Sequence, residues 1–249
     1  MATQTQYAAT AGRPVIGPQL KLGLLALLLV VALLAPLQDS PRCILVHEES
    51  GIRSFDELRD VTLAIRTGIP FSEWLKAKTD LENVRIVPYS GNVKQFLLDK
   101  KYAQQAYVFS EPFVAEQEGA KTRSLMVSDL GYNPYTSLLF ARGNVVQQHP
   151  EIARKMARAC RRGWQRYLEN PAAANRLIHE AHPEITLAAL DYGAKAIQPL
   201  CLPENAPAES LGQMSAERWQ TLADQSIEIK LLAPGKVDVN EAFRTDLLD

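Results

Sequence analysis

Short apolar runs alternate with amphipathic stretches through most of residues 42–141. Each apolar run is long enough for a strand, and the stretch after it repeats its apolar residues at helical spacing. Residues typical of strands are 42–47, 61–65, 84–89, 106–109, 124–127 and 137–141, and residues typical of helices are 55–59, 71–78, 92–101 and 112–119. Strands that alternate with short helices predict an α/β fold with a wound, mostly parallel sheet.

The pattern changes after residue 141, where helical periodicity replaces the alternation. Helices are expected at residues 151–169, 171–182, 187–196 and 215–230, and a short docked helix at 237–243. The first three of these begin near a proline or a threonine, which are residue types that favour helix starts.

The N-terminal segment has two interpretations. Residues 1–21 show no periodicity and are expected to be disordered, whereas residues 22–38 carry no charge. That apolar run falls between the apolar part of a secretory signal, about 15 residues at most, and a spanning helix of about 20. It is either a leader or tether, or the residues from Val30 to Leu37 form a buried strand of the fold.

Composition and charge narrow the class of protein. The chain has 249 residues, of which 47% are apolar and 22% charged, and its formal net charge is −1. No overall charge attracts nucleic acid or an anionic membrane, so we expect no nucleic-acid partner. The densest cationic cluster, between Arg154 and Arg166, has the spacing of a solvated helix face.

The chain offers little for catalysis or metal binding. Cys43, Cys160 and Cys201 are too far apart for a zinc motif, and buried free thiols are the simplest interpretation. His179 and His182 have metal-pair spacing, but no nearby cysteine or carboxylate set completes a site. Because no nucleophile, Walker or dinucleotide motif is present either, we expect a binding protein with no catalytic residue, metal or cofactor.

The candidate binding residues follow the predicted strands. Glu111 comes directly after the strand that ends near Phe109, at the sheet edge where wound sheets bind ligands. A carboxylate there can accept two parallel N–H bonds from an aminopyrimidine-like edge; the alternative is only a charge at a helix N-terminus. Two other strand-to-helix turns are expected to reach the same edge and supply Thr67, Gly68, Tyr89, Ser90 and Gly91.

A second loop adds aromatic rings and an amide. Tyr132 and Tyr135 are expected to stack on a flat solute, with Asn133 between them in the same loop. The alternative is that both are ordinary half-buried tyrosines.

From about Ala35 to Phe243 the chain resembles the periplasmic solute-binding components of ABC importers, in the branch related to thiamine-pyrimidine synthases and to sulfonate and nitrate binders. The block from Gln104 to Pro112 and the loop from Gly131 to Tyr135 carry most of the resemblance. Weaker matches are residues 37–41, 49–52, 89–91 and 162–171.

The resemblance implies a type II periplasmic-binding-protein fold, with two α/β lobes of wound mixed or parallel sheets that close on a ligand. It places residues 60–141 in lobe two, and residues 39–59 with 142–249 in a partial lobe one. It also implies that Glu111 grips the amino-pyrimidine edge. The family's usual aromatic-rich N-terminal third has no counterpart here, so the first lobe is expected to be incomplete.

The expected function is therefore the substrate-binding component of an ABC importer, monomeric and located in the periplasm or cell envelope. Its partners would be a membrane permease and a small organic solute, above all a thiamine-precursor-like pyrimidine. Two alternatives stay open: a pyrimidine-precursor synthase of thiamine biosynthesis, and a truncated remnant that does not bind.

Overall fold

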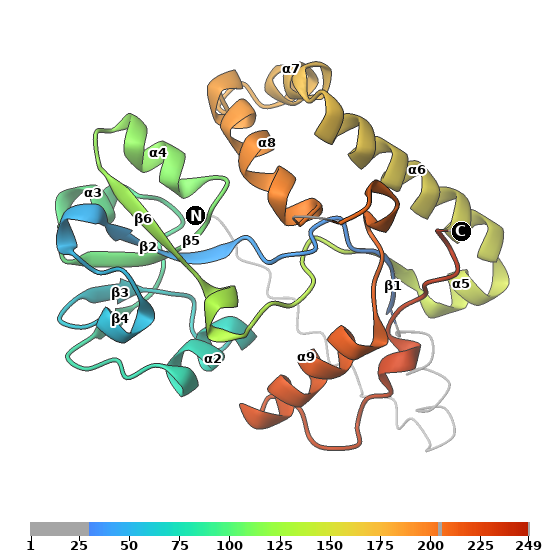
Figure 1. The fold of residues 1–249 in the computed structure, drawn as a ribbon, viewed down its shortest axis with the longest axis horizontal. Helices are drawn as coiled ribbons and strands as arrows, with labels where there is room; N and C mark the ends of the chain where they lie inside the picture. The colour runs from blue at the N-terminus through green and yellow to red at the C-terminus, as the bar shows by residue number, and fades with distance from the viewer. Residues whose placement is uncertain (1–29, 204–205, 249) are drawn as a thin grey trace, which may run out of the picture.

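The computed structural model describes residues 30–203 and 206–248. The expectations of disorder for residues 1–21 and of a leader from residue 22 to 29 lie outside them. In Figure 1 the chain forms two lobes, the sheet lobe (residues 42–130) on the left and the helical lobe (residues 30–34 and 139–203) on the right. The expected α/β class is confirmed.

The sheet lobe is built on a five-stranded sheet in the order β4-β3-β5-β2-β6. The strands are β2 (Arg42–His47), β3 (Thr62–Ala64), β4 (Arg85–Val87), β5 (Tyr102–Tyr107) and β6 (Thr122–Met126). β3 runs parallel to β4 and β5, whereas β2 is antiparallel to both β5 and β6. The sheet is therefore mixed, with one reversed strand.

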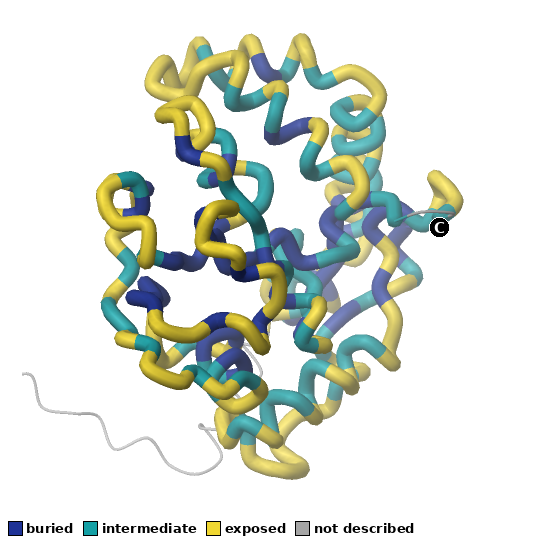
Figure 2. The backbone as a smooth tube through the Cα atoms, turned by 60° about the vertical axis from the view of Figure 1, so that its left-hand side comes forward, coloured by how far each residue is buried: buried dark blue, intermediate teal, exposed yellow. Residues whose placement is uncertain are grey.

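Alternation along β2 explains how both faces of this sheet are covered. Ile44 and Val46 face a core that includes α2 (Pro70–Lys78), whereas Cys43 and Leu45 face α3 (Lys94–Leu98) and α4 (Glu111–Gln117). Successive strand side chains point to opposite faces, so a strand apolar at every position is one that is buried on both sides. Figure 2 shows the most buried backbone in the interior of the molecule.

The helical lobe holds a two-stranded antiparallel sheet of β1 (Val30–Leu34) and β7 (Leu139–Arg142). Its helices are α5 (Gly143–Gln148), α6 (Pro150–Glu169), α7 (Ala172–Ala181) and α8 (Leu187–Cys201). α9 (Ala216–Glu228) follows, and Leu222 and Ile229 pack against the core of the sheet lobe. Short 3-10 turns lie at Glu48–Ser50, Phe55–Glu57, Val127–Leu130, Ala208–Ser210 and Val239–Glu241.

Two chain segments cross between the lobes, residues 35–41 and 131–138 (Figure 1). They are bridged to each other where Leu37 pairs with Thr136. The Asn133 amide adds two hydrogen bonds, accepting from the Ser40 N–H at 2.8 Å and donating to Asp39 Oδ1 at 2.7 Å. Paired crossings of this kind restrain how the two lobes can move relative to each other.

The structure differs from the expected lobe boundaries. Residues 39–59 were expected with lobe one, yet β2 is hydrogen-bonded between β5 and β6, and Ile52, Phe55 and Leu58 join the core beside α2. The pattern of the sequence marks an apolar strand but does not say which sheet it joins.

The part of the N-terminal apolar run that the structure describes is a strand. Ala32, Leu33 and Leu34 are at most 4% exposed, and Leu33 and Leu34 pack with Ala153 and Ala157 of α6. A strand is therefore confirmed from residue 30 to 34, and it is buried from Ala32 to Leu34, whereas Val30 is 51% exposed. Within residues 30–203 and 206–248, no helix has the length and apolar character needed to cross a bilayer.

Candidate functional site

The carboxyl ends of β3, β4 and β5 meet at one edge of the sheet, together with the first residue of β2. We call this the carboxyl edge, and define it by the loops 65–68, 88–92 and 107–111 and by Arg42. One hollow of about 570 Å³ there is lined by Thr67, Tyr89, Ser90 and Gly91 among others. A second of about 470 Å³ is lined by Gly91, Ser110 and Glu111 among others.

Glu111 is the first residue of α4 and is half-buried at this edge. Its Oε1 accepts a hydrogen bond from the Tyr89 hydroxyl at 2.7 Å, and its Oε2 accepts from the Tyr107 N–H at 2.9 Å. The carboxylate is therefore fixed by the loop after β4 and by the last residue of β5 rather than pointing into bulk water. A carboxylate has about four acceptor positions, so two bonds leave capacity for a ligand donor.

Burial of the Tyr89 phenol, and then its hydrogen bond to Glu111, raise the pKa of Tyr89 well above its usual range. The phenol is thus held as a donor at every physiological pH. Its charged form is disfavoured by a low-dielectric surrounding and by the adjacent negative charge.

We predict that Tyr89→Phe changes how stability responds to alkaline pH. The pKa of Tyr89 is higher in the folded than in the unfolded chain. Its contribution to the free energy of unfolding is therefore complete below the unfolded-state pKa of about 10 and declines as pH rises above that value. Urea unfolding at about pH 8 and about pH 11 should show a smaller loss in the variant than in the wild type. Equal losses would mean that the Tyr89 phenol is not buried beside Glu111 in solution.

Arg42 stands at the same edge in a stack of aromatic rings. Its guanidinium carbon lies 4.5 Å from the ring centre of Phe71 and 4.8 Å from that of Tyr107, and its Nη2 donates to the Tyr107 hydroxyl at 2.8 Å. Tyr107 in turn stacks on Phe109, with ring centres 5.4 Å apart and planes 2° apart. A guanidinium that lies against two rings is held in a fixed plane. In that orientation it can bind a planar or an anionic group of a ligand.

The sequence reasoning did not single out Arg42, Phe71, Tyr107 or Phe109 as binding residues. The only signal for Arg42 was its position as the polar first residue of an apolar strand. Within residues 30–203 and 206–248, no carboxylate lies within ion-pair distance of Arg42.

The turn residues of the carboxyl edge lie where the sequence predicted. Thr67, Gly68, Ser90 and Gly91 are all exposed. The Gly68 N–H is directed back to Glu73 Oε1 at 3.0 Å, and Gly68 has a φ of +76°, a backbone conformation that favours glycine. Thr67 and Gly91 line the larger hollow beside Tyr89, so the two turns are brought together.

The loop at residues 132–135 is used differently from the expectation. Tyr132 is 5% exposed and packs on Trp74, with ring centres 5.7 Å apart. Tyr135 lies under the Arg218 guanidinium at 4.3 Å, and its hydroxyl accepts from the Ser215 N–H at 3.1 Å. Both rings serve packing, and Asn133 ties the crossing segments together. The phenol that contacts Glu111 is instead that of Tyr89, and Tyr107 contacts Glu111 through its backbone N–H.

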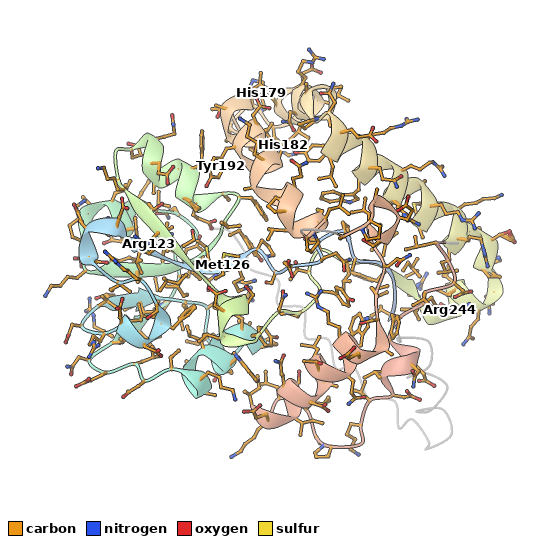
Figure 3. The ribbon with its side chains drawn as sticks, in the orientation of Figure 1. Arg123, Met126, His179, His182, Tyr192 and Arg244 are labelled. Carbon is orange, nitrogen blue, oxygen red and sulfur yellow. The ribbon has the colours of Figure 1, made fainter. Side chains whose placement is uncertain are left out.

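A groove of about 620 Å³ separates α4 from α8, and Phe109, Phe113, Tyr167 and Leu190 are among its lining residues. The lobes touch at its base. The Tyr192 hydroxyl donates to Val108 O at 3.3 Å, and a Cβ at Gly193 would meet Phe109 O at 3.3 Å. Figure 3 shows Tyr192 on α8 on the side that faces the sheet lobe.

The histidines and cysteines form no site in the described part of the chain. His179 Nδ1 lies 2.7 Å from Ile185 O and His182 Nδ1 lies 3.3 Å from Glu184 Oε1, at the top of the helical lobe in Figure 3. No group of three metal-binding side chains occurs within residues 30–203 and 206–248. Burial raises the pKa of the Cys43 thiol to about 12, as for an inert core residue.

The sequence profile described as NMT1/THI5 like matches residues 19–174, which is more than half of the chain. The chain belongs to the NMT1/THI5-like family. A curated relative, the riboflavin-binding protein RibY of Chloroflexus aurantiacus, is 26% identical over 153 residues, which cover 60% of this chain and 43% of that protein. The chain thus spans less than half the length of this relative.

Solved structures show the same fold. The periplasmic aliphatic sulphonate-binding protein SsuA of Escherichia coli superposes with a TM-score of 0.62 at 16% identity, over 85% of this chain and 68% of that one. The alkanesulfonate-binding protein SsuA of Xanthomonas axonopodis pv. citri, bound to MOPS, gives 0.55 at 16% identity, over 90% and 77%. The expected periplasmic-binding-protein fold is confirmed.

Proposed function

We propose that this member of the NMT1/THI5-like family is the substrate-binding component of an ABC importer, which acts in the periplasm or cell envelope as a monomer. It would hold a small organic solute at the carboxyl edge and deliver it to a membrane permease. The relatives are named as binding proteins, which favours binding over the alternative of a pyrimidine synthase. Substrate binding also suits a fold in which two lobes can close on a ligand.

The observation that carries the proposal is the fixed carboxylate of Glu111 beside Tyr89 at an edge shared by three strand ends. Both of its oxygens are oriented before any ligand arrives, so little ordering is required on binding. A flat solute with two adjacent N–H donors, such as an aminopyrimidine, matches the remaining acceptor positions.

A second candidate solute is an alkanesulfonate, and Arg42 is the observation that favours it. The guanidinium is held between Phe71 and Tyr107, and no ion pair within the described ranges, 30–203 and 206–248, includes it. A guanidinium presents parallel N–H donors that match the oxygens of a sulfonate.

A thermal-shift panel tests both candidates. The folded chain is heated with an aminopyrimidine, an alkanesulfonate, riboflavin or nitrate, each at several concentrations. A ligand at about 100 times its Kd should stabilise the chain by about 2.7 kcal/mol, or roughly 5–10 °C for a domain of this size. If none of the four shifts the melting temperature of a chain shown to be folded, the proposal fails.

Two variants separate the two solutes. Glu111→Gln should weaken aminopyrimidine binding roughly tenfold to hundredfold, since one charged acceptor is lost, and should leave sulfonate binding within about twofold. Arg42→Gln should have the reverse effect. If both variants bind both ligands as the wild type does, the site lies elsewhere, with the groove between α4 and α8 as the next place to examine.

A further inference from the structure

The helix α6 has one face that packs inward and one that faces solvent. Ala153 and Ala157 are buried against β1, and Cys160 and Trp164 pack beside them. Arg161, on the same side, donates to the backbone carbonyls of Leu248 and Glu209. These residues recur at helical spacing and define the inner face, to which Leu168 also contributes.

The opposite face carries three cations and two large apolar side chains. At 100° per residue its members cover about 120° of the helix surface, from Arg162 to Met156, and we call it the outer stripe. Its members are Ile152, Lys155, Met156, Ala159, Arg162, Gly163 and Arg166. Ile152 is 59% exposed and Met156 is 52% exposed, so both apolar side chains are in contact with water. Figure 1 shows α6 along the outer margin of the helical lobe, away from the sheet lobe.

Between residues 152 and 166 the outer stripe carries no carboxylate, whereas Glu151 and Glu169 are exposed on the same side of the helix, about 20° around it from Arg162. Within residues 30–203 and 206–248, the only ion pair that includes an α6 residue joins Arg154 to Asp246, at 3.9 Å, and Arg154 lies outside the stripe. Glu151 and Glu169 flank the stripe at its two ends but pair with none of its cations. A helix face kept only for solubility would usually interleave both signs of charge.

We propose that the outer stripe of α6 is a docking surface for a bilayer that carries anionic lipid headgroups. The three cations would face the phosphates, while Ile152 and Met156 would enter the interfacial layer. The stripe spans fifteen residues, from 152 to 166, or about 20 Å along the helix axis. The inference concerns the helical lobe alone and is independent of which solute the carboxyl edge binds.

Charge complementarity is the argument for a membrane rather than a neutral surface. Exposed apolar residues beside lysine and arginine are the features of helices that lie in the plane of a bilayer surface. Attraction by an anionic surface acts over about a Debye length and is screened by salt. The net charge of −1 for the whole chain does not oppose this, because the stripe is a local concentration of positive charge.

Vesicle flotation of the full chain tests the proposal. The wild type is mixed with vesicles of phosphatidylcholine alone, or of phosphatidylcholine with about 30% phosphatidylglycerol, at low and at high salt. We expect binding to the anionic vesicles that falls by about tenfold or more in high salt. The variant Lys155→Gln, Arg162→Gln, Arg166→Gln should lose that salt-dependent binding, and Ile152→Ser, Met156→Ser should weaken it.

The matched control is Lys121→Gln, Lys195→Gln, Lys236→Gln, which removes the same charge from exposed positions outside α6. It should bind as the wild type does. The wild type and all the variants retain residues 1–29, so any vesicle binding through that segment would be the same in each of them. Equal binding by the wild type and the α6 triple variant would overturn the proposal, as would equal losses in both triple variants or no binding to anionic vesicles.

Discussion

Replacing Gly212 by alanine is expected to lower the free energy of unfolding by about 3 kcal/mol or more, since overpacking costs about 1–3 kcal/mol and a positive φ a further 1–2 kcal/mol or so. A Cβ at this position would meet Leu34 Cδ1 at 1.9 Å and Cγ at 2.9 Å, and Leu34 is only 1% exposed. The residue also has a φ of +83°. In addition, Gly212 O accepts from the Ala35 N–H at 3.0 Å, so the backbone cannot easily move away.

Gly235→Ala is the control for this variant. Its φ is +70°, yet no atom lies within 4 Å of an added Cβ. It should therefore show the conformational cost alone, about 1–2 kcal/mol. Urea unfolding of both variants measures the difference. Similar losses in the two variants would mean that residue 212 does not contact Leu34 in solution. The packing of β1 described above would then be wrong at this point.

Replacing Phe96 by alanine is expected to lower the free energy of unfolding by about 3–5 kcal/mol. Phe96 lies on α3 and is fully buried, its ring stacks on His47 at 3.9 Å, and its carbonyl lies 2.7 Å from His47 Nε2. The cavity left by the ring would open beside a buried imidazole. Because α3 follows the turn at Ser90 and Gly91, the carboxyl edge would lose order together with the core.

Leu98→Ala provides the comparison within the same helix. Leu98 is 79% exposed, so its removal should change stability by no more than about 0.5 kcal/mol. The two variants are compared by urea unfolding. If Leu98→Ala proves as costly as Phe96→Ala, the face of α3 that packs on the sheet is not the one described above.

The strands were well predicted wherever apolar residues ran without interruption. β2 and β6 lie within two residues of the expected bounds, and β3 within one. β5 begins four residues earlier than expected, at Tyr102, because Gln104 and Gln105 are polar residues in a buried strand. Gln105 Oε1 accepts from the Arg66 N–H at 2.6 Å, which makes a buried amide acceptable, and no sequence pattern reveals that partner.

The candidate site was predicted in part. Glu111, Tyr89 and the turns at Gly68 and Gly91 follow three strands, and the rule that parallel strand ends share an edge was enough to group them. Arg42 was missed because β2 runs antiparallel, so its first residue, rather than its last, reaches that edge. The loop of Tyr132 and Tyr135 was assigned to the ligand because aromatic rings serve stacking and packing equally well.

The sequence by itself determined the α/β class, the placement of most helices and strands, and the carboxylate at the end of β5, because periodicity and turn residues are local properties of the chain. Only the tertiary structure decided that β2 lies within the sheet lobe, that Arg42 meets Tyr107, and that Asn133 joins the two crossing segments. These are contacts between residues far apart in the chain, up to 94 positions in the case of Asn133 and Asp39. Strand order and long-range hydrogen bonds depend on which surfaces bury each other, and local patterns carry no record of that choice.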